Sequence, residues 1–347
     1  MRFSIPACRR SARAEAQFCI WKGTPMKLFN PSTPNGSEPE EVRPAVGFLG
    51  PGAMGAGMVS RLLAEGYEVH IWARRPSKAQ RLVDLGAVME SSPADVVSAA
   101  PVVIGCLLDS DVIRELYLGP SGDDGIVAHA RAGQVFIEHA TFDPGLALEI
   151  SRSLGQRGAA FLDAPVSGGP SGALAGTLVS MVGGSTSTLR AVASILGSYC
   201  AKLKHAGEIG SGLRLKLINQ LLVSVHAVAA AEASALAINA GIDGKTAHDA
   251  LMGGWAASTM LDLQMPKAYA ADFSSGGAST GGLLEVQRLV SEMISQSGTS
   301  SELLGPVRKV FQSVSDSGHA DDGFSALLLH YLGEDATIRR SAETALQ

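Results

Sequence analysis

The chain has 347 residues, of which 46% are hydrophobic, and its formal net charge is −5. This length leaves room for about two domains. No apolar run approaches the roughly 20 residues that a membrane-spanning helix requires, so we expect no membrane partner. Lys and Arg do not cluster among aromatic residues, which excludes the usual surface for nucleic acid.

The cysteines and histidines offer no metal-binding pattern. Cys8, Cys19, Cys106 and Cys200 form no C-x-x-C pair, and the eight histidines show neither an H-E-x-x-H motif nor a Cys/His ligand spacing. These spacings predict reduced thiols in a cytoplasmic protein without a structural metal ion.

Residues 1–44 differ in composition from the rest of the chain. The early part is rich in Arg and almost free of acidic residues, and the stretch "NPSTPNGSEPEEVRP" follows it. Such a segment cannot bury enough apolar surface to fold by itself, and it lacks the apolar centre of a secretory signal peptide. Two interpretations stay open. In the first, it is an extension that is either disordered or mis-started, and a mis-start would mean that translation begins at Met26. In the second, it is a transit peptide for import into an organelle.

From residue 45 the chain alternates short apolar runs with helical patterns. The run "AVGFLG" leads into a helix expected over about residues 53–65. The further strand candidates are "EVHIWA" (68–73), "PVVIGCLL" (101–108), "QVFIEHA" (134–140), "AAFLDAPV" (159–166) and "TLVSMVGG" (177–184). This alternation predicts βαβ units on a largely parallel sheet, the α/β architecture of a Rossmann domain.

The character of the sequence changes after residue 205. The segment "GLRLKLINQLLVSVHAVAAAEASALAINAG" (212–241) lacks Pro, is rich in Leu and Ala, and ends at a Gly, which is a typical helix stop. It is too apolar all round for a surface helix. We therefore expect a Rossmann domain over 45–205, joined by this long helix to an all-α substrate and oligomerisation domain over 206–335, with a tail over 336–347.

The first expected strand ends in a glycine-rich turn, "GPGAMG" (50–55), which opens the first helix. In a dinucleotide-binding turn the first Gly permits a tight bend, the second admits a pyrophosphate, and the third lets helix and strand pack closely. The helix N-terminus adds partial positive charge. A turn without a ligand is the alternative. We expect a dinucleotide cofactor to contact Gly50, Gly52, Ala53, Met54 and Gly55.

The end of the second strand bears on which cofactor is bound. An NAD site normally places Asp or Glu there, to bind the ribose hydroxyls. Trp72 and Ala73 occupy this place, and Arg74 and Arg75 follow. A guanidinium group at this place can pair with the 2′-phosphate of NADP. We expect a preference for NADP, with NAD possible; a solvated basic loop is the alternative.

Three motifs in chain order carry a resemblance to a known family. They are "GFLGPGAMG" (47–55), "DAPVSGGPSGALAGTL" (163–178) and "GSGLRLKLINQ" (210–220), and "GFSALL" (323–328) is a weaker match. Over about residues 45–335 the chain resembles the β-hydroxyacid dehydrogenases, which include 3-hydroxyisobutyrate dehydrogenase, tartronate semialdehyde reductase and glyoxylate/succinic semialdehyde reductases.

The second motif offers a site for a carboxylate. Ser167 supplies a hydroxyl, and Gly168 and Gly169 supply free backbone N–H groups, which together can form an anion cradle. From the residues alone a plain turn is the more common reading. The resemblance implies instead that this segment binds the carboxylate of a small substrate.

The third motif places Lys216 and Asn219 at positions i and i+3 of the long helix, so that both lie on one face. A Lys near the start of an apolar helix more often reaches out to solvent. The resemblance implies that Lys216 is the catalytic acid/base and that Asn219 positions the substrate or the lysine. Burial and a nearby nicotinamide cation would each lower the pKa of this lysine.

The resemblance implies further contacts and an assembly. Leu107 and Leu108, at the end of the third strand run, and Thr141, after the fourth, lie where the family contacts the cofactor. Family members are homodimers or homotetramers that associate through the all-α domain. The chain departs from the family pattern at Leu284, where a lysine that approaches the cofactor is usual. Two alternatives stay open: an imine reductase on the same scaffold, against which Lys216 argues, and a cofactor-binding protein with little activity.

Overall fold

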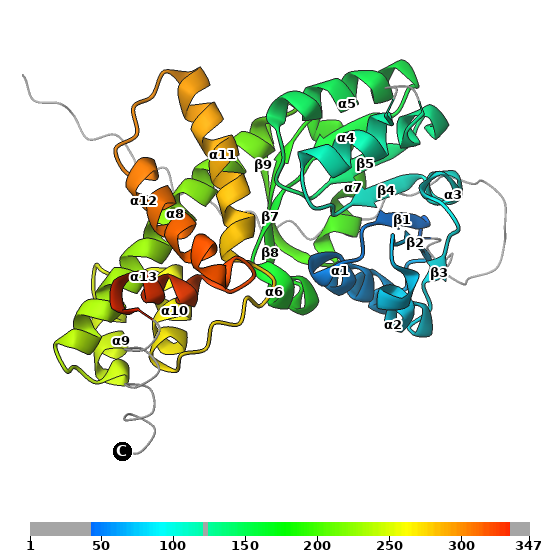
Figure 1. Ribbon diagram of the computed structural model, residues 1–347. Helices are drawn as coiled ribbons and strands as arrows, with labels where there is room; N and C mark the ends of the chain where they lie inside the picture. Colours follow the sequence, from blue (N-terminus) through cyan, green and yellow to red (C-terminus); the bar gives the residue numbers. More distant parts are fainter. Residues whose placement is uncertain (1–42, 121–123, 334–347) are drawn as a thin grey trace, which may run out of the picture. The chain divides into compact units, whose positions relative to one another are not determined.

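The computed structural model describes residues 43–120 and 124–333. The expected extension, up to residue 42, and the expected tail over 336–347 lie outside the described residues. The described chain begins with alternating strands and helices and continues with helices (Figure 1). The predicted α/β fold with a helical C-terminal part is therefore confirmed.

The described strands form one sheet of nine strands. They are β1 (Val46–Leu49), β2 (Val69–Trp72), β3 (Val88–Met89), β4 (Val102–Gly105), β5 (Val135–Glu138), β6 (Ala160–Asp163), β7 (Val166–Ser167), β8 (Leu178–Gly183) and β9 (Cys200–Gly207). The order β3-β2-β1-β4-β5-β6 is parallel throughout, and it is the strand order of dinucleotide-binding domains. The predicted parallel sheet is thus confirmed, with one difference: β8 runs antiparallel to β6 and β7.

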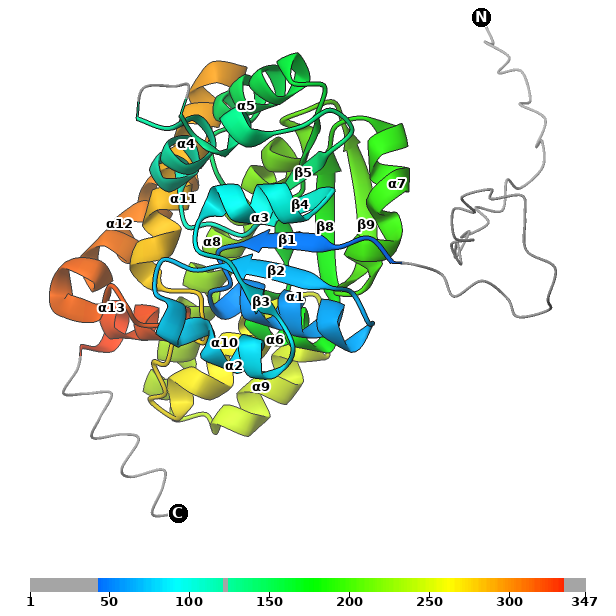
Figure 2. The same ribbon diagram turned by 90° about the vertical axis from the view of Figure 1, so that its right-hand side faces the viewer.

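Helices cover both faces of this sheet, as Figure 2 shows. One apolar core lies between the sheet and the first group of helices, α1 (Ala53–Ala64), α2 (Gln80–Asp84), α6 (Gly169–Ala175) and α7 (Thr186–Gly197). The other core includes α3 (Pro93–Ala99), α4 (Ser110–Leu118) and α5 (Pro144–Gln156). The runs "VGFL" of β1 and "VVIG" of β4 are buried throughout, because helices cover both sides of the parallel strands.

The C-terminal part of the described chain is helical. It contains α8 (Ser211–Asn239), α9 (Gly244–Met252), α10 (Thr259–Tyr269), α11 (Thr280–Ser297), α12 (Leu304–Val314) and α13 (Leu328–Leu332). Short helical turns lie at Pro76–Ala79, Ile126–His129, Ser315–His319 and Phe324–Leu327. Separate apolar clusters join α8 to α10 and to α11, so α8 is the central helix of this part.

Helix α8 is long and apolar enough, by length and composition alone, to cross a membrane. Buried core helices of soluble proteins pass the same test, and 44% of its most apolar window is buried inside the protein. Its first turns also pack against β8 and β9. These contacts identify α8 as a core helix, which agrees with the all-round apolar pattern of its sequence.

Strand β9 is not expected from the sequence. Among its eight residues only Cys200 is fully buried, so the segment has no continuous apolar run that would mark a buried strand. It becomes a strand because it pairs in parallel with β8, whose residues Leu178 and Val182 are buried. Tertiary pairing here overrides a weak local pattern.

The start of α8 is held against the sheet by a buried carboxyl group. Asp163, at the end of β6, accepts hydrogen bonds from the N–H groups of Gly210 at 2.7 Å and Leu213 at 2.9 Å. Between them, Gly212 leaves no room for a side chain, because a Cβ atom there would collide with the carbonyl oxygen of Met181 on β8. Asp163 therefore caps the helix and fixes its first turn.

We expect Asp163→Asn to lower the free energy of unfolding by about 1–3 kcal/mol, because the amide NH₂ would face a backbone donor and leave it without an acceptor. Denaturant unfolding measures this change. Asp84→Asn, which changes an exposed side chain on α2, is the matched control and should alter stability by less than about 0.5 kcal/mol. Equal stability of both variants would contradict the capping role.

Candidate functional site

The glycine turn is tight on its inner side. Gly50 has a φ of +82°, and a Cβ atom at this position would lie 2.6 Å from the carbonyl oxygen of Cys106. A Cβ atom at Gly55 would lie 2.5 Å from the carbonyl oxygen of Gly50. Side chains are thus excluded where β1, β4 and α1 meet, as the motif predicts.

The outer side of the same turn is open. A Cβ atom at Gly52 would have nothing within 4 Å. The N–H groups of Ala53, Met54 and Gly55 have no hydrogen-bond acceptor among the described residues, and no side chain caps α1. These amides carry the partial positive charge of the helix end. The residues present therefore suit the pyrophosphate of a dinucleotide.

The two arginines lie beside this turn. The N–H of Gly50 donates to the carbonyl oxygen of Trp72 at 3.3 Å, which joins the turn to the end of β2. Arg74 and Arg75 follow β2 directly, and both are exposed. No carboxylate occupies the position of Trp72 or Ala73. The geometry thus places two free guanidinium groups on the loop where a ribose or its 2′-phosphate would lie.

Two loops at the same end of the sheet carry the remaining expected cofactor contacts. Leu107 and Leu108 follow β4, and the side chain of Leu107 lies against the glycine turn, 3.0 Å from a Cβ atom at Gly50. Leu108 is 77% exposed. Thr141 follows β5 and is partly exposed. All three therefore lie at the carboxyl ends of parallel strands, where open α/β sheets bind ligands.

The expected substrate-binding segment joins β7 to α6. Gly168 and Gly169 have φ values of +133° and +67°, a backbone that side chains other than Gly rarely adopt. Ser167 is partly exposed, and its hydroxyl has no hydrogen-bond partner among the described residues. Helix α6 packs closely on α1, since a Cβ atom at Gly57 would lie 2.8 Å from the N atom of Leu174. The segment thus lies next to the cofactor turn's helix.

Lys216 is a buried cation without a partner. It is 7% exposed, and its amine has no hydrogen bond or ion pair with any residue in the described parts of the chain. Burial lowers the pKa of Lys216 to about 8. This is the direction expected for an ammonium group taken out of water.

Strand β8 connects this lysine to the substrate-binding segment. Ser167 pairs with Val179 of β8, and Gly212 lies against Met181, two residues further along the strand. Lys216 is one helical turn beyond Gly212, on the same face of α8. The fold therefore brings the start of α8, at Gly212, and Ser167 to the same strand.

Two further positions singled out in the sequence, Asn219 and Leu284, have side chains with no hydrogen bond to Lys216 or Ser167 in the described chain. Asn219 is partly buried, and its amide donates to Gln220 Oε1 at 3.1 Å. Leu284, at the position where the family usually has a lysine, packs against the apolar cluster of α8, α11 and α12. The next residue, Glu285, forms an ion pair with Arg288 of the same helix. Helix α11 thus lacks a cationic side chain at position 284 and has one, Arg288, about one turn later.

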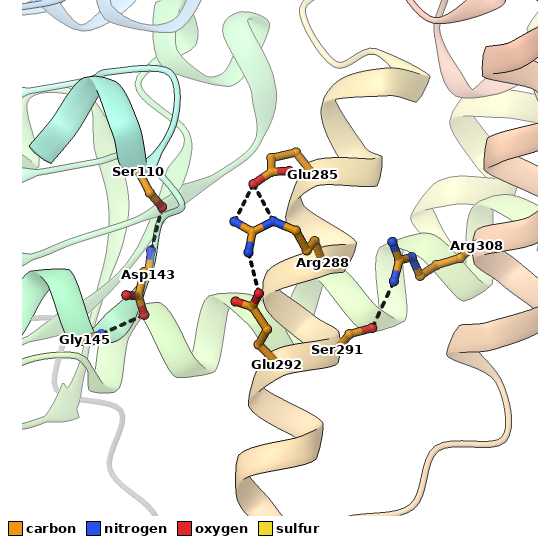
Figure 3. Close-up of polar contacts among 8 residues, drawn as sticks. All are labelled: Ser110, Asp143, Gly145, Glu285, Arg288, Ser291, Glu292 and Arg308. Atoms are coloured by element: carbon orange, nitrogen blue, oxygen red, sulfur yellow. Dashed lines mark hydrogen bonds and ion pairs between the residues drawn. The ribbon is translucent and has the colours of Figure 1, made fainter. Parts of the chain in front are cut away.

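Arg288 lines a pocket between α4 and α11. The pocket has a volume of about 450 Å³ and is lined by Asp109, Ser110, Asp111, Glu285 and Arg288. Figure 3 shows the guanidinium group of Arg288 between Glu285 and Glu292, on the side of α11 that faces Ser110 and Asp143. The lining contains neither Lys216 nor Ser167, and its residue Asp109 directly follows Leu108, one of the expected cofactor contacts.

Two carboxyl groups that stabilise the site had no role assigned from the sequence. Asp163 ends β6 and holds the start of α8, and Glu138 ends β5 and is fully buried. Each stands at the end of an otherwise apolar strand, in "FLD" and "FIE". Because buried carboxyl groups require hydrogen-bond partners, this position in a strand is the signal that could have identified them.

Known proteins share this architecture along almost the whole described chain. Residues 45–207 match the NAD binding domain of 6-phosphogluconate dehydrogenase. Residues 210–331 match the family described as "NAD-binding of NADP-dependent 3-hydroxyisobutyrate dehydrogenase". The fold and the glycine turn thus define an NAD(P)-binding oxidoreductase.

Individual relatives show which kind of NAD(P)-binding oxidoreductase the chain resembles. The chain is 30% identical to the L-threonate dehydrogenase of Cupriavidus necator, over 83% of this chain and 96% of that one. It is 33% identical to the NAD-dependent L-serine dehydrogenase of Pseudomonas aeruginosa, over 81% and 96%. The solved structure of Psf3 with NADP+ and 2-OPP superposes with a TM-score of 0.76 at 27% identity, over 83% and 99%. The chain belongs to the β-hydroxyacid dehydrogenase family and is an NAD(P)-dependent dehydrogenase.

Proposed function

We propose that this protein interconverts a small β-hydroxy acid and its semialdehyde or keto form with NADP, using Lys216 as the acid/base. The observation that carries the proposal is the burial of Lys216 without an ion-pair partner in the described chain, on the helix that packs through Gly212 against β8, the strand that pairs with Ser167. A buried amine with a pKa near 8 can both accept and donate a proton close to neutral pH.

The cofactor half of the proposal concerns the glycine turn and the loops around it. Gly50, Gly52, Ala53, Met54 and Gly55 would hold the pyrophosphate. The open amides of Ala53, Met54 and Gly55 and the open side of Gly52 support this. The side chains proposed to contact the rest of the cofactor are Arg74, Arg75, Leu107, Leu108 and Thr141. Because both arginines are exposed and lack an acidic neighbour at the end of β2, they favour NADP over NAD.

The substrate half concerns the segment after β7. Ser167 with the N–H groups of Gly168 and Gly169 would bind the carboxylate, and Asn219 would orient the reacting groups. The relatives named for L-threonate, L-serine and 3-hydroxyisobutyrate support a small hydroxylated carboxylate as the substrate class. Leu284 leaves this chain without the lysine by which the family usually approaches the cofactor.

The chemistry divides between the cofactor and the chain. When bound, the nicotinamide cofactor supplies or accepts the hydride. Lys216 takes the hydroxyl proton of the substrate during oxidation and returns a proton to the carbonyl oxygen during reduction. The residues after β7 fix the carboxylate, so that the substrate is held for reaction rather than colliding at random.

We also infer that the protein is a homodimer or homotetramer in the cytoplasm, which joins through α8. Its exposed face carries Leu215, Ile218, Leu222 and Leu236, whose spacing of three, four and fourteen residues follows a heptad repeat. Leu222 and Leu236 are 52% and 71% exposed. A second copy of this helix is the partner that matches such a stripe.

We expect the protein to oxidise NADPH when it is mixed with a panel of carboxylate semialdehydes, measured as a fall in absorbance. Lys216→Ala should lower kcat by about 10²–10⁴-fold, the range for a positioned acid/base. Reduction needs the ammonium form and should decline as pH rises through about 8, whereas oxidation of the hydroxy acid should increase over the same range.

A loss of activity must be separated from a loss of folding. Lys216→Met removes the buried ammonium group, whose lowered pKa makes it a cost to stability below about pH 8. At neutral pH this variant should therefore unfold at a denaturant concentration no lower than the wild type, and yet be as inactive as Lys216→Ala. An unchanged turnover in either variant would reject the acid/base role.

The preference for NADP is expected to depend on the two arginines. The double variant Arg74→Ser, Arg75→Ser should lower kcat/KM for NADPH by about 10- to 100-fold, the effect of losing one charge-assisted hydrogen bond of ~1.5–3 kcal/mol to the 2′-phosphate, and should change kcat/KM for NADH little. Arg81→Ser, on the exposed side of α2, is the matched control. A wild-type enzyme that prefers NADH by about tenfold or more would overturn this expectation.

The assembly is tested by Leu222→Glu, which should reduce the mass in solution toward that of one 35.8 kDa subunit. The cause is the cost of burying an unpaired carboxylate in an apolar contact. Light scattering after gel filtration measures the mass. Leu303→Glu, at a leucine that is 59% exposed but lies outside α8, should leave it unchanged. A monomeric wild type would contradict the α8 interface.

A further inference from the structure

Glu138 is a fully buried carboxyl group at the end of β5 that the proposed chemistry does not use. Its Oε1 atom accepts hydrogen bonds from the N–H of Leu107 at 3.3 Å and from the N–H of Ala140 at 3.0 Å. The first donor belongs to the loop after β4, and the second belongs to the loop after β5. One carboxyl oxygen therefore joins the two loops, next to the backbone hydrogen bond from His139 to the carbonyl oxygen of Gly105.

The residues around Glu138 leave room for its carboxyl group and form hydrogen bonds with it. Its Oε2 atom accepts a hydrogen bond from the hydroxyl of Tyr117 at 3.2 Å. Gly105 is its neighbour in register on β4, and a Cβ atom there would collide with the carboxyl group. A side chain that is enclosed in this way and bonded at both oxygens has a fixed position.

The charge of Glu138 is uncompensated by any cation. The titratable groups that face it are the thiol of Cys106 on β4, the hydroxyl of Tyr117 on α4, and the carboxyl of Asp163, its neighbour in register on β6. None of the hydrogen bonds or ion pairs in the described chain joins Glu138 to a basic side chain. Burial raises the pKa of Glu138 to about 7, and the hydrogen bonds from Ala140, Leu107 and Tyr117 oppose this rise.

The two tethered loops are those that carry the proposed cofactor contacts. Leu107 donates to Glu138 through its own N–H, Leu108 follows it, and Thr141 follows Ala140. The adjacent carboxyl of Asp163 does the same for the helix that carries Lys216. Neighbouring acids on β5 and β6 thus hold the cofactor half and the proton-transfer half of the site.

We propose that Glu138 is a positioning residue for the cofactor, whose ionised carboxylate holds the loops after β4 and β5 in the conformation that binds the nicotinamide half. The inference rests on the proposed function, because it takes Leu107, Leu108 and Thr141 as cofactor contacts. An ionised acceptor binds N–H groups more strongly than a protonated one. Cofactor affinity therefore increases as Glu138 loses its proton.

The experiment measures the Kd of NADPH and of NADH by fluorescence between pH 6.5 and 8.5, in the full chain. In the wild type we expect affinity to increase with pH. Glu138→Gln should weaken binding by about tenfold at pH 8.5, because its neutral amide oxygen accepts from the two backbone N–H groups less strongly than the ionised carboxylate does. The difference between wild type and variant also removes the titration of the ligand itself, and the variant should lack the pH-dependent gain.

Tyr117→Phe provides a second variant that keeps the carboxyl group. It removes a donor that favours the ionised form, so the pKa of Glu138 should rise and the midpoint of the affinity change should move to higher pH. A purely structural role would not produce such a shift. Glu149→Gln, which removes an exposed carboxyl from α5, is the matched control and should leave the Kd and its pH dependence unaltered.

The outcomes separate the inference from the proposed function. A wild type that binds neither NADPH nor NADH would overturn both. A wild type that binds, together with a Glu138→Gln variant of equal affinity and equal pH dependence, would overturn only the positioning role. If Glu138→Gln fails to fold, the Tyr117→Phe midpoint decides: a shift to higher pH supports the inference, and an unchanged midpoint overturns it.

Discussion

The hydrogen bonds between Asp163 and the start of α8 are the constraint on which the rest of the site depends. They join the last parallel strand of the sheet to the first turn of the helical part. Burial raises the pKa of Asp163 to about 6 in spite of these bonds, so the folded state accepts the cost of a buried charge near neutral pH. The geometry of Lys216 depends on that anchor.

The same end of the sheet shows how segments far apart in the chain come close to one another. Parallel strands place all of their carboxyl ends at one edge. β8 then reverses direction, pairs with β7 through Ser167, and receives α8 against Met181. Three separate motifs of the sequence therefore meet without a long loop between them.

Much of this arrangement is predictable from the sequence, because its signals are local. Apolar runs, the glycine turn before α1, and the all-round apolar pattern of 212–241 each follow from the periodicity of a single element. Other features depend on partners far apart in the chain. They are the antiparallel direction of β8, the strand β9, and the hydrogen bonds of Asp163 and Glu138 to neighbouring segments. Single-element patterns carry no information about such pairings.

Helix α8 carries both the proposed acid/base, Lys216, and the exposed leucines proposed as an interface. Its 29 residues run without a proline from the turn beside Asp163, past Lys216, to the exposed Leu236. A continuous helix bends little over such a length, and ~1.5 Å of axial rise per residue makes it about 40 Å long. A partner bound at the outer leucines would therefore also fix the orientation of Lys216, because one rigid helix carries both.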